Sequence, residues 1–131
     1  SCTSDSQLSR AVDIAIAPLP GPEIIAGSTR MKAGTATKLV LNMISTAVMI
    51  RLGYVYGNRM VNVAPTNAKL RDRAERLVAE IAGVAMDRAA VLLHEAGNNV
   101  RAAILMERKH WTRAEAEAAL ERAGGRLGDL L

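Results

Sequence analysis

The longest segment with a helical pattern of apolar residues covers positions 30–52. Apolar side chains recur at helical spacing there, and two denser clusters at 39–41 and 47–50 extend them around the axis. Gly53 follows, and glycine often ends a helix because it readily adopts the left-handed conformation. The pattern predicts a long helix that is apolar on nearly every face and is therefore buried.

The remainder of the chain has the pattern of shorter helices. A charged helix is predicted from about residue 65 to residue 81, starting at a Pro-Thr-Asn sequence. Three more are predicted at 86–96, 100–109 and 112–123, with glycine turns after the first and the third. Thr112 and Glu115 match the capping box, in which side chain and backbone exchange hydrogen bonds. These three helices resemble a small module of the ubiquitin-associated (UBA) type, which is an architecture and implies no ubiquitin binding.

One short apolar run, residues 11–17, has a different pattern. It is rich in β-branched residues and ends at Pro18, which predicts a strand of a buried sheet. A single strand is not stable alone. We therefore expect it to pair with another copy of the chain, or to be the residual strand of a sheet whose other strands are missing from this sequence.

Composition supports a mostly α fold. The chain has 131 residues, of which 50% are hydrophobic, yet it contains no Phe and only 2% aromatic residues. A core of Ala, Leu, Ile, Val and Met suits closely packed helices. The formal net charge is +4, which favours nucleic acid or small phosphorylated ligands as partners.

Several classes of site are not expected. Cys2 is the only cysteine, so the chain has neither an internal disulfide nor a cysteine metal cluster. His94 and His110 have no second ligand at metal-binding spacing. Arg51 closes the apolar run that starts at Leu39, so no run is expected to be long enough to span a membrane.

Polar chemistry is concentrated in residues 20–38, where a Pro-Gly-Pro loop leads into the long helix. Ser28 and Thr29 precede the helix and are suited to cap its first N–H groups. Arg30 and Lys32 lie beside the same helix end, where free N–H groups and the helix dipole favour an anion. The local pattern alone fits either an ordinary capped helix or an anion site.

The motif at residues 21–43, Gly-Pro-Glu-Ile-Ile-Ala-Gly-Ser-Thr-Arg-Met-Lys-Ala-Gly-Thr-Ala-Thr-Lys-Leu-Val-Leu-Asn-Met, closely resembles the signature of the N-acetylmuramic acid 6-phosphate etherases. These are proteins with a sugar-isomerase (SIS) domain, and the glucokinase regulatory protein carries a related segment. Further pieces match in order, including Gly57-Asn58 and residues 66–70. The resemblance therefore covers essentially the whole chain.

The resemblance implies a division into residues 1–82, the C-terminal portion of an SIS domain, and residues 83–131, a small UBA-like helical module. It implies a cytoplasmic carbon-oxygen lyase of peptidoglycan recycling that needs no cofactor. Such a lyase cleaves the D-lactyl ether of N-acetylmuramic acid 6-phosphate and yields N-acetylglucosamine 6-phosphate and D-lactate. The expected partners are this phosphorylated amino sugar and a second subunit in a homodimer, and neither nucleic acid nor a membrane.

The same resemblance implies roles for single residues. The family's catalytic glutamates lie in an N-terminal part that this sequence lacks, so no residue here is assigned to catalysis and the chain alone is expected to be inactive. The expected substrate-binding residues are Ser28, Thr29, Arg30, Lys32 and Thr35. The expected structural residues of the loop are Glu23, which would accept hydrogen bonds, together with Gly27 and Gly34.

Two other functions stay open. The chain could belong to a non-catalytic SIS-type regulator that binds a sugar phosphate, and carboxylates in the missing part would distinguish this from a lyase. A basic helical nucleic-acid module is the weaker alternative, because no recognition-helix pattern of Arg, Asn and Gln is present.

Overall fold

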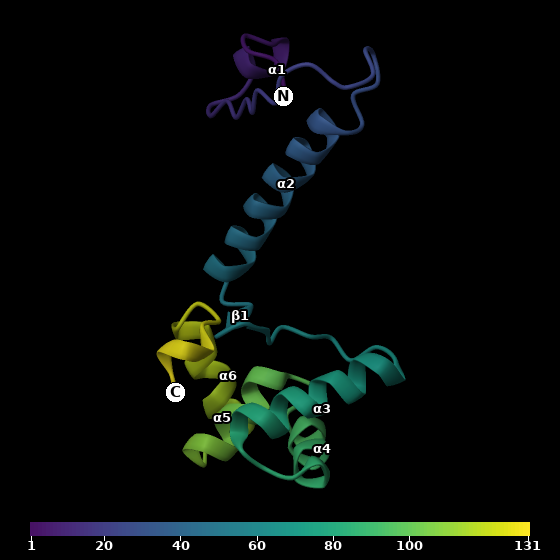
Figure 1. Cartoon of the computed structure of the whole chain (residues 1–131). Coiled ribbons are helices and arrows are strands. Elements are labelled where there is room, and N and C mark those ends of the chain that lie inside the picture. Colours follow the sequence, from purple (N-terminus) through teal and green to yellow (C-terminus); the bar gives the residue numbers. More distant parts are fainter. The chain divides into compact units, whose positions relative to one another are not determined.

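The computed structural model describes all 131 residues as two compact units, Ser1–Val48 and Met49–Leu131 (Figure 1). The chain is mostly helical, which confirms the predicted class. Its elements in order are α1 (Gln7–Arg10), α2 (Lys32–Arg51), β1 (Val55–Tyr56), β2 (Arg59–Met60), α3 (Ala68–Ala82), α4 (Met86–Glu95), α5 (Val100–Lys109), α6 (Arg113–Arg122) and a final 3-10 turn (Leu127–Asp129).

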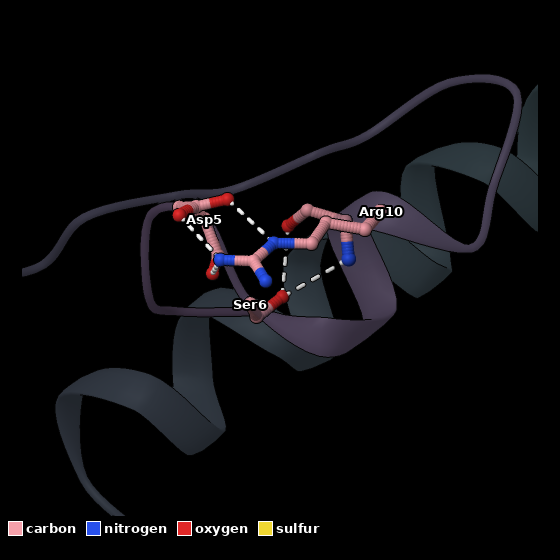
Figure 2. Close-up of polar contacts among 4 residues, drawn as sticks. Asp5, Ser6 and Arg10 are labelled. Atoms are coloured by element: carbon pink, nitrogen blue, oxygen red, sulfur yellow. Dashed lines mark hydrogen bonds and ion pairs between the residues drawn. The ribbon is translucent and has the colours of Figure 1, made fainter.

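Local polar contacts stabilise the short helix α1 (Figure 2). The Ser6 hydroxyl accepts a hydrogen bond from the Ser9 N–H at 3.1 Å, which is how serine caps a helix. The Arg10 guanidinium donates to both carboxylate oxygens of Asp5, at 2.8 and 2.6 Å. Both side chains are exposed, so the ion pair itself adds little stability.

The predicted strand at residues 11–17 is wrong, because this segment forms bends followed by irregular chain and has no strand partner. Its backbone makes two hydrogen bonds, from the Ala11 N–H to the Leu8 carbonyl at 3.1 Å and from the Ser1 amino group to the Ile16 carbonyl at 3.2 Å. A strand needs a neighbouring backbone for its N–H and C=O groups, and this chain supplies none here. Ile14 is 80% exposed as a result.

Helix α2 occupies the predicted position, but its predicted burial is wrong. None of its residues is buried, and Leu41 and Met43 are 59% and 62% exposed. No element within the unit Ser1–Val48 covers these apolar faces. By length and composition alone α2 could cross a membrane, contrary to the expectation from sequence. A helix from the core of a soluble protein has the same two properties, so they do not distinguish the two cases.

A short antiparallel hairpin follows α2. The end of α2 also lies close to the backbone of Gly125, where Gly53 leaves no room for a Cβ. Strands β1 and β2 are antiparallel, with Val55 opposite Met60, and Gly57 at the turn has φ +58°. Gly53 has φ +73°, and a Cβ placed on it would lie 2.6 Å from the carbonyl carbon of Gly125. Glycine is therefore required where α2 ends.

The core of the unit Met49–Leu131 lies among α3, α4, α5 and α6. Helix α3 packs against α4 and α5, and α5 also packs against α4 and α6 (Figure 1). The three helices predicted after residue 83 are present. Helix α3 belongs to the same compact unit, and the division at residue 82 that the family resemblance implies stays a prediction. The largest fully buried side chains are Leu92, Leu93, Ile104, Leu105, Leu127, Val61, Val78 and Val100.

Side-chain caps fix where three of these helices begin. The Asn67 side chain accepts from the Leu70 N–H at 2.9 Å, and the Asn99 side chain caps α5 in the same way. The predicted capping box at α6 is confirmed, since Thr112 and Glu115 exchange side-chain-to-backbone hydrogen bonds. Local sequence signals thus determine the start of α3, α5 and α6.

Candidate functional site

The candidate site is the loop that precedes α2 together with the first turn of that helix. Gly21 and Gly27 have φ of +77° and +85°, which glycine adopts without steric cost. The Ser28 N–H donates to the Ile25 carbonyl at 3.1 Å, forming a tight turn. Two glycines and one turn thus bring the loop back toward the start of the helix.

Glu23 provides the anion at the N-terminus of α2. One of its carboxylate oxygens accepts from the Lys32 N–H and the other from the Ala33 N–H, each at 3.0 Å. These hydrogen bonds lower the pKa of Glu23, against a smaller opposing effect of desolvation. The interpretation that Ser28 or Thr29 caps the helix is therefore wrong, because the carboxylate occupies the amides that a hydroxyl would satisfy.

Backbone contacts hold the next part of the loop against the first helical turn. The Thr29 carbonyl accepts from the Gly34 N–H at 2.9 Å, and the Met31 carbonyl accepts from the Thr35 N–H at 3.1 Å. A Cβ on Gly34 would lie 3.4 Å from the Thr29 oxygen, which is at the limit of ordinary packing. A small residue at position 34 therefore suits this close approach.

A pocket of about 210 Å³ lies within the loop. It brings together three residues that sequence analysis singled out, Glu23, Ser28 and Arg30. Thr29, Lys32 and Thr35 are not in its lining. Three apolar side chains complete the lining: Ile24, Ile25 and Met31.

The two isoleucines could have been suspected from the sequence, because consecutive apolar residues in a loop otherwise made of Gly, Pro and polar residues are unusual. Ile24 is 86% exposed and Ile25 is 68% exposed. Apolar side chains at this exposure, beside a serine hydroxyl and a guanidinium, suit a ligand with both an apolar and a polar face.

The positive charge of the site is not neutralised by ion pairs. Arg30 and Lys32 take part in none of the salt bridges of the chain. Glu23 is the one carboxylate of the loop, and both of its oxygens accept backbone hydrogen bonds. The cations therefore remain available to an anionic group.

No group of three or more His, Cys, Asp or Glu residues is placed to hold a metal ion. His94 and His110 are both exposed. That the protein needs neither a metal nor another cofactor stays a prediction.

Comparison with known proteins gives one consistent result. The chain is 56% identical over 114 residues to an N-acetylmuramic acid 6-phosphate etherase of Nostoc punctiforme, covering 87% of this chain and 36% of that protein. It is 50% identical over 129 residues to the etherase of a Synechocystis species, covering 96% and 41%. The etherase of Lactobacillus acidophilus is 44% identical over 130 residues, covering 99% and 44%. No family model matches the chain.

The resemblance noted from the sequence is thereby confirmed. The chain spans well under half the length of the curated relatives it matches, so it is homologous to a part of an etherase.

Proposed function

We propose that this chain, a homologue of N-acetylmuramic acid 6-phosphate etherases over nearly its whole length, is the C-terminal part of such a lyase and supplies one wall of its substrate site. The reaction is the cleavage of the D-lactyl ether of N-acetylmuramic acid 6-phosphate. D-lactate is eliminated, water adds to the unsaturated sugar, and N-acetylglucosamine 6-phosphate results. The observation that carries the proposal is the homology, which includes the loop before α2.

The loop chemistry suits recognition of a phosphorylated sugar. A phosphate gains strong, charge-assisted hydrogen bonds from guanidinium, ammonium and hydroxyl donors. Arg30 and Lys32 have no ion-pair partner, and Ser28 shares a pocket with Arg30. We assign these three residues, with Thr29 and Thr35, to the wall that binds the substrate.

Glu23, Gly27 and Gly34 have a structural part in this proposal. Glu23 occupies the first amides of α2, so the phosphate is bound by side chains and not by those amides. The two glycines let the loop turn and pass close to the helix. Acid–base elimination needs groups that are free to exchange protons, whereas both carboxylate oxygens of Glu23 accept backbone hydrogen bonds. We therefore assign catalysis to carboxylates outside this chain.

The exposed apolar surface supports the proposed SIS architecture. Helix α2 exposes apolar side chains on all sides, which in a soluble protein calls for covering elements. We propose that the rest of an SIS domain and a second subunit cover it, giving a cytoplasmic homodimer. Helices α4, α5 and α6 would form the UBA-like module that follows.

The same loop is compatible with a second candidate, a non-catalytic regulator that binds a sugar phosphate. The single carboxylate of the pocket, Glu23, is committed to backbone hydrogen bonds. The loop could therefore bind a phosphosugar without acting on it. The two candidates differ in whether the complete protein releases D-lactate.

A chimeric enzyme tests the proposal. This chain would replace the matching segment of the Nostoc punctiforme etherase, and D-lactate release from N-acetylmuramic acid 6-phosphate would be measured. The chimera is expected to be active and the isolated 131-residue chain inactive. A folded chimera that neither binds nor cleaves the phosphosugar would overturn the proposal. The regulator is tested with the complete natural protein, which would bind the phosphosugar and release no D-lactate, because in the chimera the carboxylates outside this chain come from the Nostoc punctiforme etherase.

A further inference from the structure

A second polar pocket, of about 340 Å³, lies wholly within the unit Met49–Leu131. Its walls come from three segments: the chain before α3, the loop between α4 and α5, and the first turn of α5. Its polar lining residues are Asn62, Asn98, Asn99 and Arg101. The lining contains one cation and three carboxamides, and no carboxylate.

Arg101 differs from the other arginines of the chain. Six arginines form ion pairs with Asp or Glu, and Arg101 is not among them. It is also partly buried, whereas the other unpaired arginines are exposed. Burial lowers the pKa of Arg101, because a cation is less stable away from water. Its charge is thus partly desolvated without an opposite charge beside it.

The hydrogen bonds of Arg101 leave donors available. Its Nη1 donates to the Gly125 carbonyl and its Nη2 to the Asn62 side-chain oxygen, each at 3.0 Å. A guanidinium has five N–H donors, so three have no protein acceptor. One of these, on Nε, is buried, and the other two are on the terminal nitrogens.

The carboxamides of the pocket also offer donors. The oxygens of Asn62 and Asn99 already accept hydrogen bonds, from Arg101 and from the Ala102 N–H. Their NH₂ groups make no hydrogen bond within the protein, and the exposed Asn98 side chain makes none at all. Arg113 lies against Gly97 at the edge of the pocket, although Glu117 partly neutralises it.

From this arrangement we propose that the pocket at Arg101, Asn62 and Asn98 binds a small oxyanion, a phosphate or a carboxylate. The oxygens of such a group could accept hydrogen bonds from the unused N–H donors of Arg101 and the asparagine side chains. Its negative charge would compensate the partly buried charge of Arg101, which has no ion-pair partner. The Arg101 guanidinium also lies over the Tyr54 ring, 5.8 Å from its centre, a cation–π contact that favours the charged form. This pocket shares no lining residue with the pocket in the loop before α2, and the inference does not depend on the etherase proposal.

The test is a titration of the 131-residue chain with inorganic phosphate, followed by backbone amide shifts in NMR. A parallel titration with acetate distinguishes a phosphate site from a carboxylate site, and sodium chloride at equal ionic strength controls for screening. We expect saturable shifts in the segment 61–65 and at residues 97–101 with one or both oxyanions. If sodium chloride produced the same shifts, or if neither oxyanion shifted the amides of these segments, the proposal would be overturned.

A matched pair of variants completes the test. Asn98→Asp places a negative charge in the pocket at a residue with φ +67°, a conformation that Asp tolerates as Asn does. It should weaken oxyanion binding by about tenfold. Asn58→Asp makes the same change outside the pocket lining and should leave the affinity unchanged. Equal affinities for Asn98→Asp and wild type would show that the anion binds elsewhere.

Discussion

The carboxylate of Glu23 accepts a 3.0 Å hydrogen bond from the backbone N–H of Ala33, ten residues further along the chain. Its other oxygen accepts from the Lys32 N–H at the same distance. This pairing closes the intervening loop onto the start of α2. Ser28 and Arg30 lie in the closed segment, so Glu23 determines where the proposed ligand-binding side chains are held.

Replacing Glu23 by Gln should loosen the loop. Glutamine has one acceptor oxygen in place of two and carries no charge, so it cannot satisfy both amides as the carboxylate does. We expect faster hydrogen exchange at the Lys32 and Ala33 amides in Glu23→Gln. Glu75→Gln, at a residue outside the loop and without a side-chain hydrogen bond, is the control. Unchanged exchange at both amides would contradict the capping role.

The same contact makes the loop sensitive to acid. The two backbone hydrogen bonds hold the pKa of Glu23 below its ordinary value of 4.5. A carboxylate with a lowered folded-state pKa stabilises the fold above its unfolded-state pKa, and that contribution is lost as the pH falls through the folded-state pKa. In an NMR pH titration, the Ala33 amide shift should have its inflection below pH 4.5. An inflection above that value would contradict this account.

The close approach of Gly53 to Gly125 predicts a large effect of one methyl group. Gly53→Ala combines a left-handed φ with a Cβ only 2.6 Å from a backbone carbon. Gly57→Ala has a similar φ and nothing within 4 Å, so it measures the conformational effect alone. Urea denaturation should show a loss of roughly 1 kcal/mol for Gly57→Ala and about 1–3 kcal/mol more for Gly53→Ala. Equal losses would mean that the backbone contact is absent.

The capping box at α6 predicts a smaller loss. Thr112→Ala removes the hydroxyl that accepts from the Glu115 N–H, and loss of such a cap costs about 1 kcal/mol. Thr66→Ala removes an exposed hydroxyl without a side-chain hydrogen bond and should change the free energy of unfolding by less than about 0.5 kcal/mol. If the two variants were equally stable in urea, the cap would not contribute.

The exposed apolar faces of α2 predict self-association of the isolated chain. Leu41 and Met43 are 59% and 62% exposed, and apolar surface of this extent promotes burial against another molecule. Sedimentation at micromolar concentration should show dimers or larger species, and the double variant Leu41→Lys, Met43→Lys should shift them toward monomer. A wild-type chain that sediments as a monomer would contradict the prediction.

Local signals in the sequence were sufficient for the helices. The Asn67 cap, the capping box at Thr112 and the glycine after α2 each depend on residues within one helical turn, so their positions are predicted well. The strand at residues 11–17 and the burial of α2 were predicted wrongly. Both features depend on contacts with neighbouring elements, and hydrophobic pattern alone cannot show whether such elements are present.

The candidate site shows the same limit. Ser28 and Thr29 look like capping residues because they directly precede the helix. The helix is capped instead by Glu23, which is distant in sequence and reaches the amides across a loop in which Gly27 adopts a positive φ. The hydrogen bonds that the sequence analysis expected of Glu23 are present, and the part of every residue in substrate binding stays a prediction.

The most direct measurement of the central claim is the affinity of the chimeric etherase for N-acetylglucosamine 6-phosphate by calorimetry. Lys32→Met keeps an unbranched side chain but removes the charge, and it should weaken binding by about 1–3 kcal/mol, which is the range for a hydrogen bond to a charged group. Lys109→Met, an equivalent change at the end of α5, should bind as tightly as the unchanged chimera. If Lys32→Met and Arg30→Met both bound the phosphosugar with unchanged affinity, the loop before α2 would not be a wall of the substrate site.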